Sequence, residues 1–253
     1  MCIFFVCEKC YCGAETETRM AARNPKDTAY DRLKTAILTL EMRPGTDLDE
    51  ARLSSEFGLS RTPLREVFRR LAGEGYVDLR QNRGARVSEM SHTTLRDFFL
   101  AAPMIYGAVL RLAAENARAD QIAALKDTQD QFRAALRTGS ARDRAILNNR
   151  FHEITGEMAG NIYLLPSFRR LLIDHARISM TFYRPANAGM AESITQAADQ
   201  HDRIIAAIEA RDPEAAGALA TEHWNLSRNR IESFVMPGGL EMPLGTLPGA
   251  RTA

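Results

Sequence analysis

The stretch SRTPLREVFRRL at residues 60–71 predicts an amphipathic helix with a basic outer face. Its apolar side chains recur at the i, i+3, i+4 and i+7 spacing of one buried face and are Leu64, Val67, Phe68 and Leu71. Thr62 is a good N-cap and Pro63 suits a first helical turn, so we expect the helix to begin near Pro63. Arg65, Arg69 and Arg70 are left on the other faces. Guanidinium groups placed in this way can fork onto guanine edges in the major groove of DNA.

A short hairpin is predicted directly after this helix. Gly75 stops the helix, and residues 76–80 alternate between apolar and polar side chains. A turn then leads to a returning strand at residues 85–88, with Arg83 and Gly84 at the tip. The pair of strands has the size and position of a wing beside a recognition helix.

Two further amphipathic helices are predicted upstream. The first carries Tyr30, Leu33, Ile37 and Leu40 on one face and ends at residues 43–45, Arg-Pro-Gly. The second runs from Asp49 to Phe57, turns Leu53 and Phe57 inward and ends at Gly58. Helix, helix, glycine turn, helix and hairpin in this order make a winged helix-turn-helix.

A plain three-helix bundle with a solvated basic face is the alternative for this region. The positive charge of residues 61–86 favours DNA binding, although the chain as a whole is nearly neutral. Residues 61–86 hold seven arginines against three acidic residues, whereas the whole chain has a net charge of +1. The excess of positive charge is therefore confined to one patch, on the predicted recognition helix and hairpin.

Residues 27–90 resemble the DNA-binding domain of GntR-type bacterial repressors. The resemblance rests on the run Ser-Arg-Thr-Pro-Leu-Arg-Glu at 60–66, followed in register by Leu71, Glu74-Gly75 and Arg83-Gly84. It implies the following contacts with DNA: Arg61, Thr62 and Arg65 with bases or phosphates, Ser54 and Ser60 with the backbone, and Gly84 with the minor groove. We add Arg69, from the helix, and Arg83, from the wing tip. A basic residue that some relatives place in the second helix falls at Ala51, and Arg52 beside it would point about 100° away.

Length and composition fit two domains between two tails. The chain has 253 residues, of which 45% are hydrophobic and 26% charged. No segment approaches the ~20 consecutive apolar residues of a membrane span, so we expect a cytoplasmic protein without a membrane partner. After residue 236, the proline and glycine runs of 237–253 predict a flexible C-terminal tail.

Residues 1–26 predict a disordered tail or a misassigned start, because Met20 stands just ahead of the first helix like an ordinary initiator. The four cysteines, Cys2, Cys7, Cys10 and Cys12, all lie in this segment. Cys7, Cys10 and Cys12 could be half of a zinc knuckle, but the second half of such a site is missing nearby.

Residues 91–236 are almost entirely helical in pattern. We expect helices at 93–118, 120–137, 141–159, 161–184, 191–210 and 213–235, with Pro103 kinking or breaking the first. The expected fold class is mainly α, an N-terminal winged helix-turn-helix domain followed by a C-terminal all-α bundle.

Four residues of the bundle form a candidate metal site. Asn148 and His152 lie four residues apart and share one helical face, while His201 and His223 lie on two later helices. Imidazole-rich ligation suits zinc, nickel, copper or iron better than calcium or magnesium. Each histidine taken alone is also compatible with a hydrogen-bonded or surface role.

Residues 93–235 resemble the FCD ligand-binding domain of the FadR branch of GntR regulators. The matching pieces are Asn148-x-x-Phe151-His152, Gly160-Asn161, the block from His201 to Asp212, and His223. The resemblance implies that Asn148, His152, His201 and His223 bind a divalent metal, zinc or nickel above all, within a domain that holds the effector. Asn148 replaces a commoner aspartate. A neutral ligand set predicts weaker metal binding and a preference for an anionic effector. His175 and Arg177 could supply a polar wall of the effector pocket.

The sequence therefore predicts a ligand-responsive transcriptional regulator rather than an enzyme. We expect a nucleoid-associated repressor that binds a palindromic DNA operator as a homodimer and responds to a small organic acid, with residues 88–92 as the hinge. Two alternatives remain. One is a metal-dependent hydrolase using the histidines with Glu153 or Glu222. The other is a constitutive DNA-binding protein whose bundle only dimerises.

Overall fold

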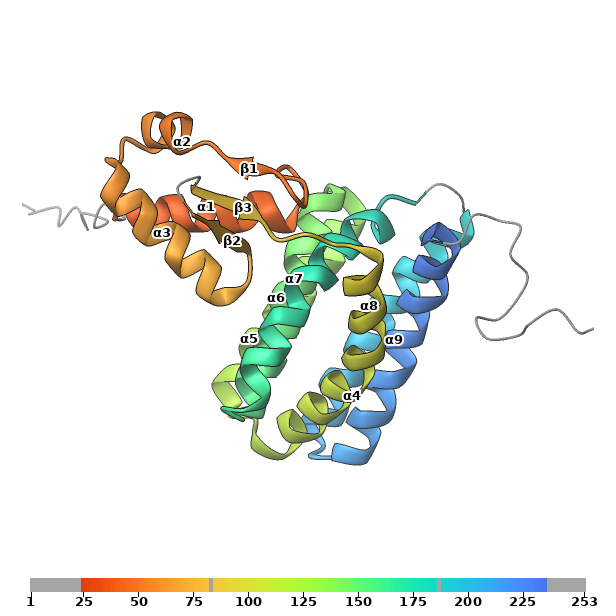
Figure 1. The fold of residues 1–253 in the computed structure, drawn as a ribbon. Coiled ribbons are helices and arrows are strands. Elements are labelled where there is room, and N and C mark those ends of the chain that lie inside the picture. Colours follow the sequence, from red (N-terminus) through yellow and green to blue (C-terminus); the bar gives the residue numbers. More distant parts are fainter. Residues whose placement is uncertain (1–23, 82–83, 186–187, 236–253) are drawn as a thin grey trace, which may run out of the picture.

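The computed structural model describes residues 24–81, 84–185 and 188–235 and has two parts (Figure 1). The winged-helix part comprises α1 Pro25–Leu38, β1 Asp47–Leu48, α2 Glu50–Phe57, α3 Arg61–Glu74, β2 Val77–Arg80 and β3 Gly84–Val87. The bundle comprises α4 His92–Asn116, α5 Ala119–Thr138, α6 Ala141–Ala159, α7 Leu164–Phe182, α8 Ala188–Glu209 and α9 Pro213–Val235. The fold class is as expected. The four cysteines and both expected tails lie outside the described residues, apart from Asn24 to Lys26, where α1 begins.

The wing is a three-stranded antiparallel sheet with the order β1-β3-β2. The hairpin of β2 and β3 was expected, but β1 was not, because two residues carry no alternating pattern. Asp47 of β1 pairs with Arg86 of β3, and Val77 of β2 pairs with Val87. The strand β1 therefore ties the start of α2 to the wing.

The helix ends differ from expectation at two places in this part. Helix α3 begins at Arg61 with Ser60 as its N-cap, two residues before Pro63, and the Ser60 side chain makes no capping bond. Helix α1 ends at Leu38, so Leu40 lies beyond it, with φ of +59°. The first difference leaves the buried face of α3 unchanged, whereas Leu40 is only partly buried and packs against the cluster of Phe132 and Tyr183 in the bundle.

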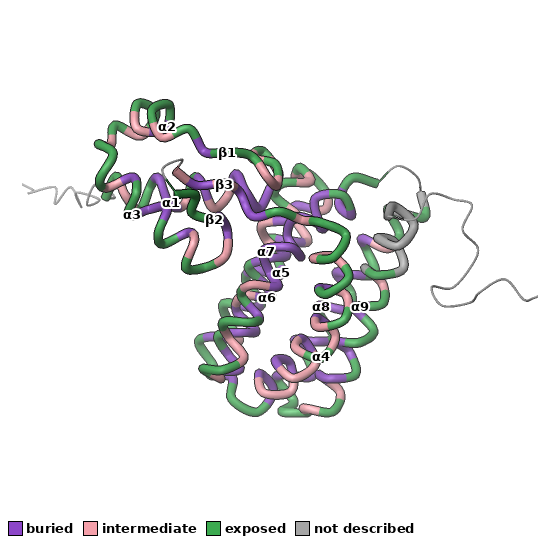
Figure 2. The backbone as a smooth tube through the Cα atoms, in the orientation of Figure 1, coloured by how far each residue is buried: buried purple, intermediate pink, exposed green. Residues whose placement is uncertain are grey.

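Helix α7 joins the two parts. Twelve of its 19 residues are buried, and its tube is mostly purple in Figure 2. Ile173 and Ala176 pack into the core of the winged-helix part, while Phe168 and Leu172 pack into that of the bundle. Burial on two sides explains why residues 171–180 of this helix have no exposed face.

The helices of the bundle fall within three residues of their expected limits at every described end. Helix α4 packs on α9, α6 and α7, and α5 packs on α6 and α8. Helix α4 continues through Pro103, so of the two expected effects, a kink or a break, the break does not occur. A proline removes one helical hydrogen bond, but the buried Phe98 and Ala102 hold the preceding turn in the core. This helix is long and apolar enough to cross a membrane by those two criteria, yet part of its apolar surface packs inside the bundle.

Candidate DNA-binding face and metal centre

The recognition helix α3 presents its basic side chains outward. Leu64, Val67, Phe68 and Leu71 are buried as the periodicity predicts. Arg61, Thr62, Arg65 and Arg69 are all exposed on the rest of the helix surface. Ser60 is exposed at the N-terminus, where free backbone N–H groups favour a phosphate. These five residues are accessible to DNA.

The other expected contacts are Ser54, Arg83 and Gly84. The hydroxyl of Ser54 is buried and has no hydrogen-bond partner, and its expected contact with the DNA backbone stays a prediction. Arg83 lies outside the described residues. Gly84 begins β3 with φ of +75°, a conformation that favours glycine. The guanidinium of Arg70 lies over the ring of Tyr30 and pairs with Asp27, so this side chain packs against α1.

Sequence reasoning missed two carboxylates on this face. Glu50 accepts hydrogen bonds from Nε of Arg65 at 3.0 and 3.2 Å. Asp47 accepts two from Arg86, at 2.7 and 2.8 Å. Both acids line a hollow of about 540 Å³ between β1, α2, α3 and the wing. Glu50 and Arg65 are 15 positions apart, and Asp47 and Arg86 are 39 positions apart. Helical or strand periodicity does not predict contacts over such separations, so these pairs could be found only in the folded structure.

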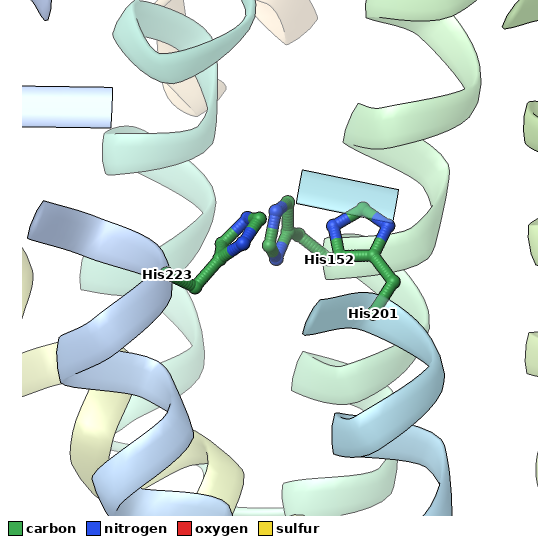
Figure 3. A group of neighbouring side chains, drawn as sticks. All are labelled: His152, His201 and His223. Carbon is green, nitrogen blue, oxygen red and sulfur yellow. The ribbon is translucent and has the colours of Figure 1, made fainter. Parts of the chain in front are cut away.

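Three histidines from three helices meet inside the bundle. His152 of α6, His201 of α8 and His223 of α9 have ligand atoms within 4.8 Å of one another (Figure 3). All three side chains are buried. Asn148, one turn before His152 on α6, is also buried. The structure therefore brings the four sequence-predicted ligands into one region, three of them within reach of a single ion.

Two glutamines fix the orientation of two of these rings. Gln129 donates to the backbone of Ala198 at 2.8 Å, so its oxygen faces Nδ1 of His201 at 3.1 Å. Gln200 likewise faces Nδ1 of His223 at 2.9 Å. An amide oxygen only accepts, so each Nδ1 carries the proton and each Nε2 keeps its lone pair. Metal-binding histidines usually have such a partner on their other nitrogen.

Unpaired buried atoms fit a bound cation. Oδ1 of Asn148 and Nε2 of both His152 and His201 are buried without a hydrogen-bond partner. Burial lowers the pKa of His152 and His201 well below 6.5 and that of His223 to about 4, so all three imidazoles are neutral at neutral pH. Buried polar atoms are rarely left unpaired, and neutral imidazole is the form that binds metal. The residues present fit a divalent transition metal.

Comparison with known families agrees with both halves of this arrangement. Residues 25–87 match the family described as bacterial regulatory proteins, gntR family, and residues 103–226 match the FCD domain. The chain is 30% identical over 128 residues to an HTH-type regulator of Agrobacterium vitis from the TAR-I ttuE-ttuC' intergenic region, covering 49% of this chain and 75% of that protein. The chain belongs to the GntR family.

Two other similar proteins match over most of their length. The HTH-type transcriptional repressor RspR of Escherichia coli is 28% identical over 210 residues, which are 82% of this chain and 89% of RspR. The solved structure of E. coli McbR/YncC has the same fold, with a TM-score of 0.70 and 18% identity over 85% of this chain and all of that one. This GntR protein is thus a DNA-binding transcriptional regulator of the bacterial cytoplasm, and neither the family nor the named relatives are enzymes.

His175 lies beside the histidine cluster of the FCD domain. Its ring is 4.8 Å from that of His152, and its Nδ1 is 2.5 Å from the hydroxyl of Tyr106. Burial lowers the pKa of His175 to about 3 and raises that of Tyr106, so a neutral ring accepts from a protonated hydroxyl. These side chains and Trp224 surround a cavity of about 10 Å³, room for about one water. Nothing in the sequence spacing pointed to Tyr106 or Trp224.

Arg177 does not line this cavity, and its expected role in a wall of the effector pocket stays a prediction. It is fully buried and donates to the backbone oxygen of Ser88 at 3.2 Å and to the Ser88 hydroxyl at 3.0 Å. Asp174 accepts a third bond at 3.2 Å and a further one from Arg170 at 2.8 Å. Two residues apart on a helix, His175 and Arg177 necessarily point in different directions. Arg177 holds the start of the expected hinge.

Proposed function

We propose that this GntR regulator is a repressor that binds a palindromic operator as a homodimer and is controlled by a small carboxylate bound at a metal in its FCD domain. One observation carries the proposal. Helix α7 places His175 against the histidine cluster and Arg177 against the segment that leads out of the wing. A change around the metal can therefore reach the recognition helix through one rigid element.

The DNA half of the proposal assigns base and phosphate contacts to one face. Arg61, Thr62 and Arg65 reach the major groove, Ser60 and Arg69 hold phosphates, and the wing with Arg83 and Gly84 lies along the minor groove. Exposure of the α3 side chains supports this assignment. One such face recognises one half-site, so a two-fold dimer would read an inverted repeat.

The metal half assigns His152, His201, His223 and Asn148 as ligands of zinc or nickel. The unpaired atoms of this set and its neutral imidazoles support the assignment. When bound, the metal supplies a Lewis-acid centre that attracts an anionic oxygen. None of the four ligands carries a negative charge that would offset the charge of the ion. An anionic effector would supply that charge, which favours a carboxylate over a neutral metabolite.

The small size of the cavity suggests how the effector acts. A cavity of about 10 Å³ is too small for an organic acid, so the side chains around it must move apart on binding. Tyr106 and His175 are hydrogen-bonded across its wall. Displacement of His175 would shift α7 and with it Arg177 and Ser88. Domain arrangements that match the half-site spacing would then lose population.

Elemental analysis of the purified full-length protein is the first test. About one zinc or nickel per chain, lost in His201→Ala, is the expected result. A screen of small carboxylates against the metal-loaded protein would then measure affinity for an operator selected from random duplexes. Metal content near zero after incubation with zinc or nickel would overturn the metal centre. DNA affinity unchanged by every carboxylate would instead favour a constitutive DNA-binding protein.

A further inference from the structure

Glu50 lies at the centre of the DNA-binding face without an assigned role. It is the first residue of α2, and it lines the hollow of about 540 Å³ described above as well as a second one, of about 180 Å³, between α3 and the wing. Its side chain is only 18% exposed, whereas that of Arg65 is 56% exposed. An acid at the middle of a surface that must approach phosphates costs DNA affinity, so its position calls for a reason.

The fold holds Glu50 in place from two sides. The backbone of Asp49 and Glu50 follows β1, which pairs with the wing strand β3. Gly84 of the wing lies against the side chain, because a Cβ at Gly84 would stand 3.3 Å from both Cγ and Oε1 of Glu50. The carboxylate is therefore fixed by the scaffold, and Arg65 is the more exposed member of the pair.

The geometry of the pair leaves one edge of the arginine available. Both hydrogen bonds use Nε of Arg65. The guanidinium is a planar fork, so a partner at Nε alone leaves the terminal edge, formed by Nη1 and Nη2, available to a second partner. Those two groups are a suitable pair of donors for O6 and N7 of guanine. A long side chain held in this way loses less conformational freedom when it binds a base.

We propose that Glu50 is a specificity-determining residue that positions Arg65 to read guanine and, through its charge, weakens binding to DNA of any other sequence. The proposal rests on the base contact that the proposed function gives to Arg65. Both effects increase the ratio of the affinity for the correct sequence to the affinity for other DNA. Pre-organisation favours the correct base, and repulsion of phosphates disfavours contacts that carry no sequence information.

The test begins with selection of the preferred half-site from random duplexes with the full-length protein. Affinities are then measured for the selected duplex, for duplexes with single base changes and for random duplex, each at two salt concentrations. Arg65→Ala should flatten the preference at one base position. Glu50→Ala should flatten it at the same position, with a loss of roughly ten-fold in the ratio of affinities. Binding of random duplex should become tighter.

Two further variants keep the test sharp. Glu50→Gln retains an acceptor oxygen without the charge, so it should keep part of the base preference while binding random duplex more tightly. Glu56→Ala is the matched control, because Glu56 is on the same helix and pairs with Arg32 and Arg52 instead. It should leave the base preference unchanged. Thermal unfolding of each variant checks that the winged-helix part remains folded.

Three outcomes separate this proposal from the one on which it rests. If Arg65→Ala leaves every base preference intact, the base contact of the proposed function is wrong, and the role of Glu50 falls with it. If Arg65→Ala removes a preference that both Glu50 variants keep, only the role of Glu50 is overturned. Equal tightening of all duplexes by Glu50→Ala would also overturn it, since Glu50 would then only repel phosphate.

Discussion

Arg177 on α7 holds Ser88 at the end of the wing, donating to its backbone oxygen at 3.2 Å and to its hydroxyl at 3.0 Å. The residues are 89 positions apart, and both are buried. Because Ser88 also donates its backbone N–H to Tyr76, the same residue links the hairpin to the bundle. The junction between the two parts is therefore built around a buried cation rather than a loose connection.

Replacement of Arg177 by Met should destabilise the protein by about 3 kcal/mol, because it leaves buried polar groups of Ser88 and Asp174 without this partner. Urea unfolding measures the loss, and hydrogen exchange should become faster at residues 88–91. Arg203→Met is the control, since Arg203 and Glu222 form an exposed pair, and it should cost well under ~1 kcal/mol. Equal effects of the two variants would contradict a structural role for the buried bonds.

Removal of the Gln129 side chain should weaken metal binding by roughly 10- to 100-fold, because Gln129 fixes the ring and the tautomer of His201. Competition with a chromophoric chelator measures the affinity of Gln129→Ala for zinc. Gln131→Ala is a matched control on the same helix, where Gln131 bonds only to the exposed Asp127 among the described contacts. An unchanged zinc affinity in Gln129→Ala would mean that His201 can bind zinc without a hydrogen-bond partner at Nδ1.

Replacement of Asn148 by Asp should tighten zinc binding, because a carboxylate offsets the charge of the ion and an amide oxygen does not. The same replacement should reduce the advantage of carboxylate effectors over neutral ones. Titration of the metal-free proteins with zinc compares the zinc affinity of Asn148→Asp with that of the unmodified protein. Affinity that does not change would argue that Asn148 is not a ligand.

The metal-free protein should lose stability as the pH falls from about 6.5 towards about 4. Burial lowers the pKa of His223 from 6.5 to about 4 and that of His152 and His201 in the same direction. Between these values the unfolded chain binds protons that the folded chain does not, so the stability present above 6.5 is lost on acidification.

The urea midpoint of metal-free protein measured across this pH range tests the expectation. His92→Gln, which removes an exposed histidine, should give the same profile as the unmodified chain. Saturating zinc should move the loss to lower pH, because the metal binds the neutral rings of the folded state only. A midpoint independent of pH would show that the buried rings accept protons as readily as exposed ones.

The spacing of residues along the chain was enough to predict the helices and many residues of the candidate DNA-binding face and metal centre. The four apolar residues of α3 recur with the helical period, and every described end in the bundle lies within three residues of its expected limit. Asn148 and His152 share a face because they are four residues apart. The helix does not break at Pro103, because packing around α4 offsets one missing hydrogen bond.

The sequence by itself determined which segments are helical, which faces are apolar and which side chains could bind DNA or metal, because these follow from spacing within a few residues. Only the tertiary structure decided that three helices bring His152, His201 and His223 together, that Glu50 holds Arg65, and that Arg177 binds Ser88 at the start of the hinge. Each of these depends on how helices and strands rotate and cross when their apolar faces pack. That rotation is set by contacts between residues far apart in the chain, which no local periodicity records.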